Sequence, residues 1–134
     1  MRKLFTLIVF ALIAIQVSAQ SKVDELNLLI LKNNYKEALI KSQELIKESP
    51  DKGQGYYSQA LVYKLMYKYP QAIQAIHKAI ELEPENTTFL AEYGFLLQKT
   101  DSDRKAQDVF EQVIKLDPYH LSVGFILSSK YLKQ

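Results

Sequence analysis

A period of 34 residues runs along most of the chain and constrains its fold more than any other feature of the sequence. Two residue types mark this period: prolines at Pro50, Pro84 and Pro118, and alanines at Ala38, Ala72 and Ala106. Proline ends helices, because it lacks an amide hydrogen and clashes with the preceding turn. A fixed period of this length indicates a stacked array of repeats, each of which is one supersecondary unit.

The unit at the centre of the chain, Gly53–Asn86, predicts two amphipathic helices joined by a tight turn. Its first half carries Tyr56, Ala60 and Tyr63 on one helical face, with spacings of four and three. The second half carries a longer apolar face, which consists of Ala72, Ile73, Ile76, Ala79 and Ile80. Pro84 then ends the second helix, so the unit is predicted to be a helix–turn–helix.

This unit resembles the tetratricopeptide repeat (TPR), whose pattern is W-x2-L-G-x2-Y, then A-x3-F, then a closing proline. The matching residues are Tyr56, Ala60, Tyr63, Ala72, Ile76, Ala79 and Pro84. Gln59 departs from the pattern, which has leucine at that position. The following unit matches the same pattern at Tyr93, Gly94, Ala106, Phe110, Val113 and Pro118.

The first unit matches less well, as a terminal repeat without an upstream neighbour does. It keeps Ala38, Leu45 and Pro50, but Lys22, Glu25 and Leu26 replace the aromatic residue, leucine and glycine of its first helix. The resemblance covers nearly all of the chain after residue 19. It implies an all-α fold, a right-handed α-solenoid of helix–turn–helix repeats. The repeats are expected at about 20–52, 53–86 and 87–120, with a C-terminal capping helix over 121–133.

The first 19 residues have the composition of a secretory signal peptide. Arg2 and Lys3 give a basic start, and Leu4 to Val17 is almost unbroken apolar sequence. The small residues Val17-Ser18-Ala19 then precede Gln20. Fourteen helical residues reach about 21 Å, which is less than the roughly 30 Å of a bilayer's hydrocarbon core. A retained membrane anchor is the alternative. We therefore expect cleavage after Ala19, a periplasmic or secreted product, and a first repeat helix over Lys22–Lys32.

Charge and cysteine content limit the partners and the kind of stabilisation. Arg2 and Lys3 leave with the signal peptide, so 15 basic residues remain against 15 acidic ones. A nearly neutral chain has no basic excess for phosphates, which argues against nucleic acid as a partner. Because there is no cysteine, neither a disulfide nor a lipid anchor on cysteine is available, and no stable membrane insertion is expected after cleavage.

Catalytic and metal chemistry finds little support in the sequence. The chain has two histidines, His77 and His120, and neither has a second ligand at helical spacing. Asp101, Asp103 and Asp108 suggest calcium only loosely, since a calcium loop of that kind needs a glycine where Lys105 stands. We therefore expect a protein that is not an enzyme and that binds neither a metal ion nor a cofactor.

The TPR resemblance implies a binding groove, which the first helix of each unit lines. The 34-residue step then gives three rows of inward-facing residues: Val23, Tyr57, Ala91 and Phe125; Asn27, Leu61, Phe95 and Ser129; and Ile30, Lys64, Gln98 and Leu132. Tyr57, Leu61 and Phe95 form an apolar strip, which favours an apolar or aromatic partner segment anchored at Tyr57 and Phe95. The alternative is that these side chains fill gaps between adjacent first helices.

One known type of TPR groove clamps a terminal carboxylate with lysine, asparagine and arginine. The matching positions here are occupied by Val23, Asn27, Ser58, Thr88 and Glu92. Only Asn27 fits that type, and Glu92 would repel a carboxylate. A ligand of that kind is therefore not expected.

Taken as a resemblance, the pattern implies an exported, non-catalytic protein–protein interaction module that binds a partner protein or extended peptide in its concave groove. The alternative is a self-associating structural scaffold of the cell envelope, a homodimer formed through the C-terminal helix. Phe125, Leu127 and Tyr131 leave that helix apolar on more than one side.

Overall fold

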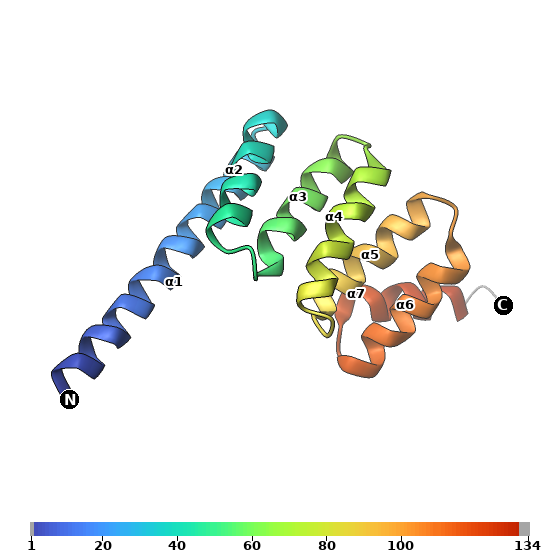
Figure 1. Cartoon of the computed structure of the whole chain (residues 1–134). Coiled ribbons are helices and arrows are strands. Elements are labelled where there is room, and N and C mark those ends of the chain that lie inside the picture. Colours follow the sequence, from blue (N-terminus) through green and yellow to red (C-terminus); the bar gives the residue numbers. More distant parts are fainter. Residues whose placement is uncertain (1, 132–134) are drawn as a thin grey trace.

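The computed structural model describes residues 2–131, which fold into seven helices and no strand. The helices are α1 (Arg2–Leu31), α2 (Tyr35–Glu48), α3 (Gly53–Leu65), α4 (Tyr69–Leu82), α5 (Thr87–Lys99), α6 (Asp103–Leu116) and α7 (Leu121–Tyr131). Figure 1 shows α2 to α6 side by side in chain order, while the N-terminal half of α1 extends away from them. Leu132 and Lys133, at the end of the predicted capping helix, lie outside the described residues.

Each helix packs against the next helix in the chain, from α1 to α7. Short turns join α1 to α2, α3 to α4 and α5 to α6, and these three helix–turn–helix pairs stack one after another (Figure 1). Contacts are thus made between neighbours along a line, as in a repeat array. The all-α solenoid predicted from the 34-residue period is confirmed.

The alanines that mark the period lie in the core of the array. Ala38, Ala72 and Ala106 are buried. Gly94 on α5 faces the ring of Phe110 on α6 so closely that even a Cβ atom at this position would collide with the ring. Small side chains recur at these positions because a larger one would force the paired helices apart.

The same period appears in the backbone of the turns inside the pairs. Asn33, Tyr67 and Asp101 all adopt left-handed conformations, with φ of 58°, 58° and 53°. At the end of α3, the amide of Lys68 donates to the carbonyl oxygen of Tyr63, and the amide of Tyr67 donates to that of Lys64. This pair of bonds is the Schellman motif, in which one left-handed residue ends a helix.

The first helix differs from the sequence prediction, because α1 begins at Arg2 and runs unbroken through residue 19 to Leu31. The stretch Leu4–Leu31 is long and apolar enough to cross a membrane, a property that a signal sequence near the N-terminus shares. The length of the apolar run therefore does not distinguish a cleaved signal peptide from a retained membrane anchor. Every described side chain from Leu4 to Ser18 is exposed, and the first buried one is Leu26. Removal of residues 4–18 would thus take no buried side chain out of the core.

Candidate functional site

Two side-chain pairs join the first helices of the second and third repeats, α3 and α5. The rings of Tyr57 on α3 and Phe89 on α5 are stacked, with centroids 5.0 Å apart and planes inclined by 26°. The Nζ atom of Lys64 on α3 lies 2.6 Å from Oε1 of Glu92 on α5. Tyr57 and Lys64 are two helical turns apart, so they occupy the same face of α3.

Glu92 is the buried member of this ion pair. Its side chain is 8% exposed, against 30% for Lys64. The Oε1 atom is inaccessible to solvent and accepts no hydrogen bond, so the contact with Lys64 is an ion pair without hydrogen-bond alignment. The pKa of the Tyr57 phenol is raised, mainly because the ring is largely buried and further because of the negative charge of Glu92.

A hollow of about 320 Å³ lies beside this pair, between α1 and α3. The residues that line this α1–α3 hollow are Asn27, Ile30, Leu31, Leu61, Lys64 and Leu65. Four of them belong to the rows expected from the 34-residue step: Asn27, Ile30, Leu61 and Lys64. The lining is mainly aliphatic, with the Asn27 amide and the Lys64 ammonium group as its polar members.

The remaining predicted residues of α1 and α5 are distributed among different surroundings. Val23 lines a separate hollow with Leu45 of α2 and Gly55 of α3. Ala91 is 3% exposed and lies in the core, so it offers almost no surface to a partner. The ring of Phe95 is partly buried against Phe110, with centroids 5.4 Å apart and planes inclined by 57°.

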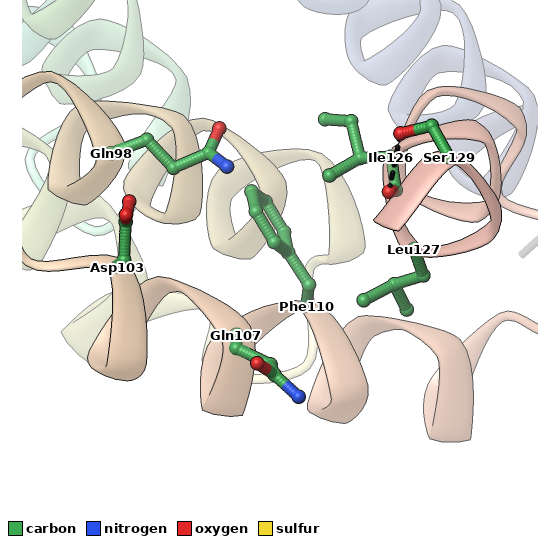
Figure 2. Close-up of a pocket in the computed structure, with 7 residues that line it drawn as sticks. All are labelled: Gln98, Asp103, Gln107, Phe110, Ile126, Leu127 and Ser129. Carbon is green, nitrogen blue, oxygen red and sulfur yellow. Dashed lines mark hydrogen bonds between the residues drawn. The ribbon is translucent and has the colours of Figure 1, made fainter. Parts of the chain in front are cut away.

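Gln98 and Ser129 line a hollow of about 240 Å³ between α5, α6 and α7. Figure 2 shows the ring of Phe110 at its centre, between Gln98 on α5 and Ile126 on α7. Phe125, also on α7, is 75% exposed and does not line this hollow. Leu132, the last member of the third row, lies outside the described residues. The rows therefore do not form one continuous groove in the described part of the chain.

The histidines are engaged in ordinary contacts. The ring of His77 is exposed but lies against Tyr93 of α5, with centroids 4.6 Å apart. The Nδ1 atom of His120 is 3.3 Å from the hydroxyl of Ser122. Across the described residues, no group of three or more histidine, cysteine, aspartate or glutamate side chains could hold a metal ion.

Sequence reasoning missed the burial of Glu92 and its partner. The signal was present, since Glu92 is the one charged residue in the apolar run Phe89–Phe95. A charged residue inside an apolar helical stretch is rarely buried unless it is paired. The 34-residue step could not identify Lys64 as its partner, because the two residues occupy different positions of their repeats.

Comparison with known proteins supports the stacked helix–turn–helix fold. The family model described as tetratricopeptide repeat matches residues 53–86. The first TPR domain of Spaghetti (RPAP3), bound to the HSP90 peptide SRMEEVD, is 19% identical, with a TM-score of 0.75 over 87% of this chain and 94% of that one. The chain folds as a tetratricopeptide repeat array. No curated protein matches it.

Two further solved structures share the TPR fold. The second TPR domain of human RPAP3, in complex with the HSP70 peptide SGPTIEEVD, is 22% identical with a TM-score of 0.72, over 83% of this chain and 92% of that one. MamA from Desulfovibrio magneticus RS-1 is 24% identical with a TM-score of 0.67 over 76% of this chain. The TPR array spans 58% of that MamA chain.

Proposed function

We propose that this TPR array is a non-catalytic protein–protein interaction module, and that the side formed by its first helices binds an extended partner segment with apolar or aromatic residues. The observation that carries the proposal is the α1–α3 hollow, where Asn27, Ile30, Leu61 and Lys64 come together from two repeats. An aliphatic hollow with a few polar groups suits an apolar side chain flanked by peptide backbone. Two TPR domains of the same fold were solved with bound peptides.

The two predicted aromatic anchors, Tyr57 and Phe95, are poor probes of partner binding. Tyr57 and Phe95 each contact a ring within the array, so alanine at either position also removes internal packing. Leu61 is the better probe, because it lines the α1–α3 hollow and is only partly buried. Ile40 on α2 is a matched control, since it is exposed and lines no described hollow.

The test is a selection of random displayed peptides on residues 20–134, followed by affinity measurement with the best synthetic peptide. Selected peptides should be rich in aromatic and aliphatic residues, and Leu61→Asn should weaken binding by about tenfold, as loss of a buried aliphatic contact does. Ile40→Asn should leave the affinity unchanged. Failure to select any peptide, or equal losses in both variants, would rule out the proposed surface.

The compartment forms a second part of the proposal. Export to the periplasm or the medium, with cleavage after Ala19, is supported by the basic start, the apolar run and the small residues that precede Gln20. The exposure of every described side chain from Leu4 to Ser18 is also consistent with a segment that is removed.

A self-associating scaffold of the cell envelope is the alternative function, favoured by one observation on α7. Leu121 and Phe125 are 89% and 75% exposed, on a helix whose main contact with the array is with α6. Such a surface favours association with a second copy. Sedimentation of residues 20–134 at increasing concentration distinguishes the two functions, because only the scaffold requires a dimer.

A further inference from the structure

The carboxylate of Glu92 is unusual for a group at this depth. A buried carboxylate is expensive unless it is paired and accepts hydrogen bonds. The Glu92 side chain is more than nine-tenths buried, yet its Oε1 atom accepts no hydrogen bond. The close partner of this oxygen is the ammonium group of Lys64, whose contact has the distance of an ion pair but not the angles of a hydrogen bond.

The charge of Glu92 is balanced by a lysine that remains partly in water. Its ammonium group contacts Oε1 at 2.6 Å without hydrogen-bond alignment, and its side chain is 30% exposed. Lys64 is in the last turn of α3, and a lysine head on a flexible four-carbon stem can turn into water at little cost. Lys64 can thus be displaced by a cation that fits the carboxylate better.

The surroundings of Glu92 suit such a cation. The rings of Tyr57 and Phe89 stack on each other between the same two helices, and the Tyr57 ring, which is only partly buried, offers apolar surface to the stem of a bound lysine or arginine. Arginine in particular can donate two parallel hydrogen bonds to one carboxylate. The α1–α3 hollow shares Lys64 with this site, so neighbouring apolar residues of the same ligand would have a place to bind.

We propose that Glu92 binds a lysine or arginine side chain of the partner segment, which replaces Lys64 at the carboxylate while adjacent apolar residues occupy the α1–α3 hollow. This inference rests on the proposed function and adds the charge of its ligand. The partner segment is therefore both apolar and basic. Lys64 keeps Glu92 paired while no partner is bound.

Peptide selection with three proteins tests this inference. Random displayed peptides are selected in parallel on residues 20–134 and on the same protein with Glu92→Gln or Glu85→Gln. Glu85 is the matched control, because it is exposed and lies at the end of the second repeat. Peptides selected on the unaltered and Glu85→Gln proteins should be enriched in lysine or arginine beside aromatic or aliphatic residues. Those selected on Glu92→Gln should lack the enrichment.

Affinities of one selected peptide give the quantitative form of the test. Replacing its basic residue by methionine should weaken binding to the unaltered protein by about tenfold, as loss of a charged hydrogen bond does. On Glu92→Gln, the two peptides should bind equally. Lys64→Met should strengthen binding of the basic peptide, because it removes the internal competitor. A purely structural ion pair would give the opposite sign or no change.

The outcomes separate this inference from the function on which it rests. Selected peptides without basic residues, or equal affinities of the basic and methionine peptides for the unaltered protein, would overturn the role of Glu92 alone. Failure to select any peptide would overturn both. Lys64→Met leaves a buried carboxylate unpaired and could unfold, so circular dichroism accompanies each variant. If it unfolds, Glu92→Gln decides the outcome, because glutamine preserves the shape without the charge.

Discussion

Tyr67 adopts a conformation that is strained for its residue type. Its φ of 58° is shared by Asn33, and Asp101 at 53° is similar. Asparagine and aspartate tolerate the left-handed region, whereas a bulky side chain there costs roughly 1–2 kcal/mol. The Tyr67 side chain is 80% exposed, and its one ring contact is edge-on to Tyr69 at 6.4 Å, which returns little of that cost.

Tyr67→Asn should therefore stabilise the protein, by about 1 kcal/mol in the free energy of unfolding. Urea denaturation followed by circular dichroism measures the change. The reverse substitution at the equivalent turn, Asp101→Tyr, should destabilise the protein by a similar amount. A Tyr67→Asn variant no more stable than the unaltered protein would show that the turn carries no strain.

The ionisation of the Tyr57 phenol is also set by its immediate surroundings. Burial first, and the charge of Glu92 second, raise the pKa of its phenol above the ordinary value of 10.0. The folded state therefore holds this proton more tightly than the unfolded state, and stability falls as the pH rises through about 10. Ultraviolet titration of tyrosinate should show a component with a raised pKa that is lost in Tyr57→Phe. In Glu92→Gln its pKa should move only part of the way back, because burial remains.

At the scale of helices, Glu83 and Asn86 connect the starts of α3 and α5. Glu83 accepts a hydrogen bond from the amide of Gly53 at 2.8 Å and from the side-chain amide of Asn86 at 2.9 Å. Asn86 in turn accepts from the amides of Thr88 and Phe89 and so caps α5. One short network thus holds the beginnings of two successive first helices together.

Asn86→Ala should cost about 1 kcal/mol of stability, the usual price of a lost helix cap. Thermal unfolding measures it. Ser102→Ala is the matched control, since Ser102 occupies the same position before α6 but makes no capping bond, and its loss should be smaller. Equal effects at the two positions would contradict the capping role of Asn86.

The helices that sequence reasoning placed well are those with clear end signals. Apolar periodicity and the recurring prolines predicted the helix–turn–helix of the central repeat, which the structure has as α3 and α4, because both signals act locally. The beginning of α1 was missed, since Ser18, Gln20 and Ser21 do not break a helix that is already formed. A cleavage site is recognised by a peptidase and leaves no mark on helix geometry.

The candidate site was predictable only in part, for a reason that particular residues show. The 34-residue step placed Asn27, Ile30, Leu61 and Lys64 together because α1 and α3 repeat the same contacts. It did not foresee that Ala91 would be buried, since α5 packs against both α4 and α6, whereas the main helix contact of α1 is with α2. Equivalent positions in a repeat array thus occupy the same place in their repeats but can differ in how deeply their side chains are buried.

At the scale of the whole molecule, α1 joins an apolar segment to the first repeat without a break. Leu4–Leu31 is 28 helical residues, about 42 Å at the rise of an α-helix. The described side chains from Leu4 to Ser18 lie in solvent, where their apolar area is unfavourable. Removal of residues 1–19, as proposed above, or their placement in a membrane would take this apolar area out of water.

The proposed cleavage after Ala19 makes these two fates distinguishable. Signal peptidases require small residues at the site, so Ala19→Arg should block processing and leave a longer, membrane-associated chain. Mass spectrometry of the purified protein and fractionation of cells measure both properties. Ser21→Arg is the control, since it lies beyond the proposed site and should still give a product that begins at Gln20. An unchanged product from Ala19→Arg would move the site. Recovery of the unaltered protein with Arg2 and Lys3 intact, in the membrane fraction, would instead show that α1 anchors the TPR array and holds it beside the bilayer.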